Sequence, residues 1–139
     1  MPKTRLDKVV TVRERTEDAA LTHLARARAT LQEAHAHLAG AMARSRTDGR
    51  ARAQAEFWQL EEAAHARALE TVRAAQQHLA RAANTESEAR SGYVSAHREA
   101  QVVRRVAERK RTELRSSAEK AEQKQSDELA TQRFIYSGK

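Results

Sequence analysis

Residues that interrupt helices are almost absent from this 139-residue chain, and that absence limits what it can fold into. Pro2 is the only proline, and the four glycines stand at positions 40, 49, 92 and 138. Ala, Glu, Arg and Gln, which all favour helices, fill most of the other positions. Aromatic residues make up only 4% of the chain, so few bulky side chains are available for a thick layered core. The sequence therefore predicts an all-α fold of long helices.

An apolar heptad pattern runs through the first third of the chain. Residues alternate at spacings of three and four, which is typical of the seam along which two helices of a coiled coil pack. The seam holds Val10, Glu17, Leu24, Leu31 and Leu38 at one position, and Arg13, Ala20, Ala27, Ala34 and Ala41 at the other. This pattern predicts a helix over residues 4–46.

A second heptad register runs without a slip through the rest of the chain and predicts a helix over about 53–133. One seam position holds Val72, Leu79, Glu86, Tyr93, Ala100, Ala107, Leu114 and Ala121, and the other holds Ala75, Ala82, Ala89, Ala96, Val103, Lys110 and Ser117. Thr85 and Glu88 have capping-box spacing and Ser91-Gly92 follows, and such features can interrupt a helix. The register continues through them, which favours a single, bent helix and leaves two helices broken at 84–92 as the alternative. The tail 134–139 leaves the pattern and is expected to fray.

The strongest turn signal lies between the two heptad patterns. Ser45-Arg46-Thr47-Asp48-Gly49 combines capping side chains with a glycine, which predicts a turn over about 47–57. We therefore expect a single domain over 1–139, an antiparallel two-helix coiled-coil hairpin with the form of an elongated rod. The second helix outruns the first by about 30 residues or more, so either its C-terminal part projects unpaired or the bend lies later.

No motif for catalysis, a metal or a cofactor is present. The chain has no cysteine, no glycine-rich phosphate loop and no Gly-x-Ser-x-Gly. Its six histidines are never three or four residues apart, the spacing that puts ligands on one helical face. Glu62 and His65 supply only one copy of the Glu-x-x-His element that di-iron bundles use in pairs. We expect a protein that is not an enzyme and uses no cofactor.

The chain also lacks the signals of export and of membrane insertion. No stretch approaches the roughly 20 apolar residues of a membrane span, and residues 1–15 contain no apolar signal core. Together with the absence of cysteine, this predicts a cytoplasmic protein without membrane insertion.

Basic residues concentrate at both ends of the chain, whose formal net charge is +7. Residues 1–50 hold 10 Lys or Arg against 6 Asp or Glu, residues 51–100 hold 6 against 7, and residues 101–139 hold 10 against 6. The cluster from Arg104 to Arg111 fits a solvated helix face, a contact with an acidic protein, or nucleic-acid binding. Nucleic acid is disfavoured, because Glu108 and Glu113 lie among the basic residues and no aromatic residue is interleaved with them for base stacking.

Phe57, Trp58 and Leu60 form the densest bulky cluster and follow the predicted bend. Two interpretations stay open for them. They either close the hairpin as a hydrophobic clasp or form an exposed anchor for a partner, since exposed aromatic residues often dominate binding energy.

The two ends of the chain resemble the FliJ/YscO family of coiled-coil stalk proteins from flagellar and type III secretion export ATPases. The resemblance rests on residues 5–18, with Arg13-Glu14-Arg15-x-Glu17, and on residues 119–133, with Asp127-Glu128-x-Ala130. It implies a non-catalytic, cytoplasmic hairpin peripheral to the inner-membrane export apparatus. Its paired termini would enter the export ATPase hexamer and promote its assembly and activity, and its other end would meet the membrane export-gate protein.

The resemblance also implies contact residues and further partners. For the ATPase, the residues expected are Arg5, Lys8, Arg13, Arg15, Arg104, Arg105, Arg109, Lys110 and Arg111. For the export gate, they are Phe57, Trp58 and Leu60, and secretion chaperones are additional candidate partners. The alternative is a generic coiled-coil adaptor or secretion chaperone without a motor partner. The sequence does not distinguish a flagellar system from an injectisome.

Overall fold

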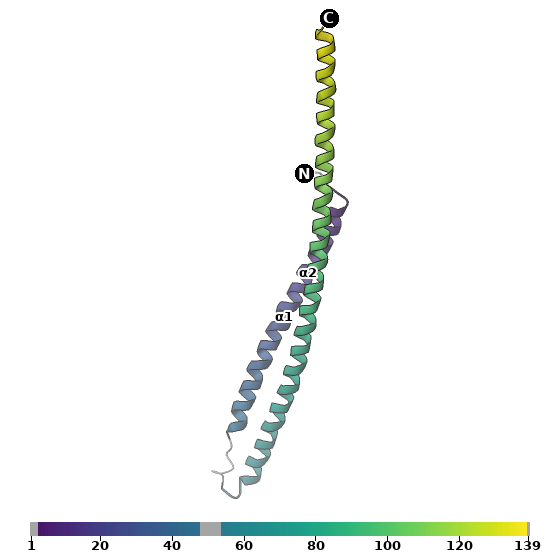
Figure 1. Ribbon diagram of the computed structural model, residues 1–139. Coiled ribbons are helices and arrows are strands. Elements are labelled where there is room, and N and C mark those ends of the chain that lie inside the picture. Colours follow the sequence, from purple (N-terminus) through teal and green to yellow (C-terminus); the bar gives the residue numbers. More distant parts are fainter. Residues whose placement is uncertain (1–2, 48–53, 139) are drawn as a thin grey trace. The chain divides into compact units, whose positions relative to one another are not determined.

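The computed structural model describes residues 3–47 and 54–138, which form two α-helices and no strand (Figure 1). Helix α1 spans Leu6–Arg46, and α2 spans Trp58–Ser137. The two long helices pack against each other, which confirms the predicted all-α helical hairpin. Residues 48–53, in the predicted turn, lie outside the described residues. Just before α2, the Phe57 amide donates a hydrogen bond to the Gln54 carbonyl at 2.9 Å.

A reciprocal cap starts α1 two residues later than the heptads predicted. The Thr4 amide donates to Asp7 Oδ2 at 2.8 Å, and the Asp7 amide donates to the Thr4 carbonyl at 3.1 Å. The Thr4 hydroxyl also donates to Asp7 Oδ1 at 3.2 Å. These bonds occupy backbone amides that have no partner within the helix, so the capping residue rather than the apolar pattern sets the boundary.

Helix α2 is continuous through residues 84–92, so the alternative of two helices broken there is not observed. Thr85, one of the predicted breakers, donates its hydroxyl to the Arg81 carbonyl at 3.0 Å and so satisfies its side chain within the helix. The helix also reaches Ser137, whereas the sequence predicted fraying from residue 134. Gly138, the first helix breaker after Gly92, donates its amide to the Phe134 carbonyl at 3.2 Å as the helix ends.

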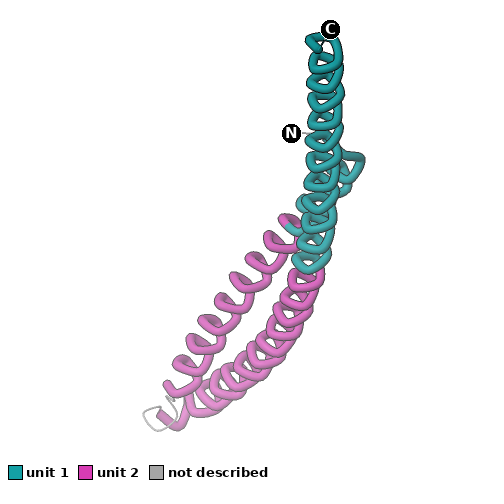
Figure 2. Tube along the Cα trace, turned by 45° about the horizontal axis from the view of Figure 1, so that its top comes forward, with its two compact units in different colours: residues 1–17, 96–139 teal, residues 18–95 magenta. Residues whose placement is uncertain are grey.

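The chain divides into two compact units, each built from part of both helices (Figure 2). Unit 1 comprises Met1–Glu17 and Ala96–Lys139, and unit 2 comprises Asp18–Ser95. Within each unit the two helices run antiparallel. Residues later in α1 contact residues earlier in α2. In unit 1 the partners are Asp7 with Arg111 and Glu17 with His97.

Alanine forms most of the buried seam. In unit 2, Leu24, Ala27 and Ala89 form a buried cluster against which Tyr93 packs, and Ala34, Ala41, Ala75 and Ala82 are also buried. In unit 1 the buried apolar residues are Ala96, Ala100 and Ala107. Small side chains at successive seam positions allow the two helices to approach closely, and no large side chain is completely buried among the described residues.

The last part of α2 has no partner helix among the residues of unit 1 that the structure describes, 3–17 and 96–138. Asp7, in the first turn of α1, contacts Arg111, so α1 begins at about that level of α2 and does not extend beside the residues that follow. Every residue from 117 to 137 is exposed. We call residues 117–137 the C-terminal arm. Of the two explanations that the sequence left open for the longer second helix, the structure shows an unpaired C-terminal part.

Candidate interaction sites

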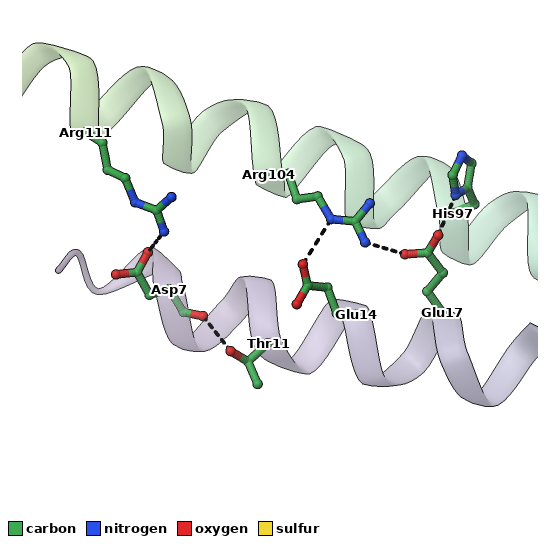
Figure 3. A network of polar contacts seen from close by, with 7 residues as sticks. All are labelled: Asp7, Thr11, Glu14, Glu17, His97, Arg104 and Arg111. Carbon is green, nitrogen blue, oxygen red and sulfur yellow. Dashed lines mark hydrogen bonds and ion pairs between the residues drawn. The ribbon is translucent and has the colours of Figure 1, made fainter. Parts of the chain in front are cut away.

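Ion pairs join the two helices along one side of unit 1 (Figure 3). Arg111 pairs with Asp7, and Arg104 donates to Glu14 at 3.1 Å and to Glu17 at 2.6 Å. His97 Nδ1 lies 2.5 Å from the second carboxylate oxygen of Glu17. We call this side, with Asp7, Glu14, Glu17, His97, Arg104 and Arg111, the ion-pair side. Each pair shows which level of α1 lies beside which level of α2 in unit 1.

Glu17 is the buried member of the ion-pair side, with 9% of its surface exposed. The hydrogen bond with His97 is the largest influence on its carboxyl group and holds the pKa of Glu17 below its ordinary value. Bonds from Arg104 act in the same direction, and partial burial opposes them. The bonds to Glu14 and Glu17 in turn raise the pKa of Arg104. His97 and Arg104 therefore favour the ionised form of this seam carboxylate.

Asp7 and Glu86 show the same effect at two other places. The pKa of Asp7 is lowered first by the bond from the Thr4 amide and then by Arg111, so one carboxylate both caps α1 and joins it to α2. In unit 2, the buried Glu86 accepts a bond from Arg90 at 2.7 Å and lies 3.5 Å from Arg28 on α1. Arg90 is the main cause of the lowered pKa of Glu86.

The nine basic residues assigned to ATPase contact all lie in unit 1, but they fall into two groups. Arg13, Arg104 and Arg111 pair with acidic residues of the other helix, the first with Glu99 at 2.6 Å. Lys110 lies 3.8 Å from Glu113 within α2. The other five are exposed and form no ion pair with any residue of 3–47 or 54–138: Arg5, Lys8, Arg15, Arg105 and Arg109.

The ion pairs of Arg104 and Arg111 with acidic residues of α1 were not predicted from the sequence. A signal was present, because Asp7 and Glu14 are seven residues apart, as are Arg104 and Arg111. Each pair follows a seam position, where opposite charges on antiparallel helices meet across the interface. The five unpaired basic residues are therefore the better candidates for an external acidic surface.

The cluster assigned to the export gate lies at the start of α2 in unit 2. Phe57, Trp58 and Leu60 have exposed fractions of 53%, 44% and 63%. Side chains with this much exposed surface are available to a partner. Their exposure favours the anchor interpretation over the clasp.

The predicted seam residues differ in how far they are buried. Leu24 is buried, and those that are half-buried are Val10, Leu31, Leu38, Val72, Leu79, Tyr93 and Val103. Leu114 is exposed because it lies beyond the level at which α1 begins. Among residues 3–47 and 54–138, no group of three or more His, Cys, Asp or Glu side chains is placed to hold a metal ion. No helix in that part of the chain is long and apolar enough to cross a membrane.

Comparison with known protein families gives a match over nearly the whole chain. A family model described as "Flagellar FliJ protein" matches residues 2–139. The chain belongs to the FliJ family. The match confirms the predicted membership and ties the chain to flagellar protein export. No curated protein and no solved structure gives a match to the chain. The contact residues above therefore rest on the geometry of this chain and on the family resemblance.

Proposed function

We propose that this FliJ-family protein is the non-catalytic central stalk of a cytoplasmic export ATPase, promotes the assembly and activity of the hexamer, and links it to the membrane export gate. The C-terminal arm carries the proposal. It is an exposed helix in the same unit as the start of α1, and no helix among the described residues 3–47 and 54–138 packs against it. A helix that already stands free can enter a ring of other subunits without first breaking contacts of the hairpin.

The exposed side chains of the arm fit a contact with protein. Its tip holds Phe134, Ile135 and Tyr136, of which Phe134 is 80% exposed. Aromatic side chains at a helix end supply large contact areas with little loss of conformational freedom. Arg105 and Arg109, which precede the arm on α2, would meet acidic groups of the ATPase. Such charge contacts steer association more than they add affinity.

The gate contact is assigned to Phe57, Trp58 and Leu60. Exposure of all three supports it, since an apolar anchor must be free in the unbound protein. In this proposal the gate and the ATPase bind to different units of the chain, unit 2 and unit 1 respectively.

Two charge reversals test the ATPase contact. Arg105→Glu with Arg109→Glu changes only unpaired residues, so it should leave helix content intact while weakening ATPase binding and its stimulation. Arg104→Glu with Arg111→Glu breaks the ion-pair side, so it should lower the thermal stability as well.

Truncation after Ser116 provides a second test, because it removes the arm and leaves every buried residue of the described seam in place. It should retain the hairpin and lose stimulation of the ATPase. If ATPase binding and stimulation survive both the first charge reversal and the truncation, the stalk role is wrong, and an adaptor without a motor partner accounts better for the fold.

A further inference from the structure

The valines of this chain are concentrated in unit 1. Six of the eight occur in two short segments, 9–12 and 102–106. Val10 and Val103 lie in the seam and are half-buried. The other four, Val9, Val12, Val102 and Val106, are between 43% and 58% exposed. We call these four residues the valine face.

Helical geometry places the four exposed valines on the same side of unit 1. On α1, Val9 and Val12 lie on the side away from Asp7 and Glu14, at about 100° per residue. On α2, Val102 and Val106 lie on the side away from Arg104 and Arg111 in the same way. Since the acidic residues and the arginines pair with each other on one side of the hairpin, the valines of both helices share the opposite side.

The register brings these valines to the same level. An ion pair lies at each end of this part of unit 1. Asp7 pairs with Arg111 at one end, and Arg13 pairs with Glu99 at the other. Between them Val9 lies level with Val106, and Val12 with Val102, to within about one helical turn. The valine face is therefore a compact patch that both helices share.

The hairpin itself gives no reason for valine at these positions. Valine is a weaker helix former than the Ala, Arg and Glu that fill most exposed positions, because its branched side chain loses rotamer freedom in a helix. Single exposed apolar residues are ordinary, but four on one side of a short segment form a patch of the kind that marks an interaction site.

Unpaired arginines border the valine face. Arg5 lies four residues before Val9, and Arg109 lies three residues after Val106, at the same level on the other helix. Arg105 lies between Val102 and Val106 along the outer edge. None of the three arginines pairs with an acidic residue in 3–47 or 54–138. Positive charge at one end of an apolar patch favours a partner with carboxylates at the matching end.

We propose that the valine face docks an acidic amphipathic helix of another protein. Apolar residues of that helix, three and four positions apart, would cover the four valines, and carboxylates one or two turns further along would meet Arg5 and Arg109. The hairpin and its ligand would then form a local three-helix bundle. This inference does not depend on the identity of the export ATPase as a partner.

Two other occupants fit the face less well. A second copy would bring its own arginines to the same patch, while the nearby Glu99 is already paired with Arg13. A membrane surface favours Trp, Phe and Leu on the side that penetrates the lipid, whereas this side carries valine.

The test uses a display library of helical peptides in which the charged positions of the peptide are randomised. Peptides are selected for binding to the immobilised full-length protein. Enriched peptides should be acidic and amphipathic. They should bind Val12→Ala with Val102→Ala at least about tenfold more weakly than the wild type, and Val94→Ala with unchanged affinity. Val94 is the matched control, since it is an exposed valine on the same helix but in unit 2. Arg5→Glu with Arg109→Glu should also weaken these peptides.

Several results would overturn the proposal. One is enrichment of basic or non-helical peptides, and another is binding that Val12→Ala with Val102→Ala does not weaken. A fall in the thermal stability of that double variant would show that the valines pack within the hairpin, because alanine is the better helix former at exposed sites. Sedimentation that reveals a dimer lost in the variant would assign the face to a second copy. Variant-sensitive binding to phosphatidylserine vesicles would assign it to a membrane.

Discussion

Leu24 offers the sharpest test of the seam, because it is the only large side chain of the buried cluster and is 3% exposed. The substitution Leu24→Ala removes the three terminal carbons of the side chain. At roughly 0.8 kcal/mol for each buried methylene, this loss costs about 2.4 kcal/mol. A cavity term adds to that cost in a rigid core, but a seam between two helices has solvent on two sides and can partly close. We expect the free energy of unfolding to fall by about 2 to 3 kcal/mol.

Leu21→Ala is the matched control, since the same residue type lies one turn away on α1 with 48% of its surface exposed. It should cost less than about 1 kcal/mol, because alanine recovers part of the loss through its higher helix propensity. Urea unfolding followed by far-UV circular dichroism gives both values. If the two variants lie within about 0.5 kcal/mol of each other, the heptad seam is not where the hairpin gains its stability.

Three further predictions concern pH, the anchor cluster and the arm. Folding lowers the pKa of Glu17 and of Glu86 below the ordinary glutamate value of 4.5, so their ionised forms stabilise the fold at any pH above 4.5. This stabilisation should be lost as the pH falls below 4.5 and the two carboxylates become protonated. Thermal melts of Glu17→Gln should accordingly depend less on pH in that range than those of the wild type. Phe57→Ala with Trp58→Ala should abolish gate binding at little cost in stability, whereas a fall of several kcal/mol would restore the clasp interpretation. Limited trypsin digestion should cut first after Lys120 and Lys124, and early cuts between residues 18 and 46 would contradict the free arm.

The heptad pattern was sufficient to predict the helices and most of the seam. Ala27, Ala34, Ala75 and Ala82 were assigned to it from spacing alone, and all four are buried. Spacing follows directly from the helical repeat, so it is a property of each helix by itself.

The pairing between the helices could not be derived in the same way. Sliding α1 along α2 by one heptad keeps every seam residue in the seam, so the apolar pattern fits several registers almost equally. Charged residues favour the observed register, because Arg13 pairs with Glu99 and Arg28 with Glu86, whereas a slip of one heptad would place Gly92 or Val106 opposite Arg13. The valines of the two helices come to the same level only in that register, which is why the sequence alone did not bring them together.

The register of the two helices also determines how far the C-terminal arm reaches. A slip of one heptad would change the length of free helix by about 10 Å, at 1.5 Å per residue. It would also break the pairs of Arg13 with Glu99 and of Arg28 with Glu86. In the stalk role proposed above, contacts inside the hairpin would therefore fix the depth to which the arm enters the ATPase ring.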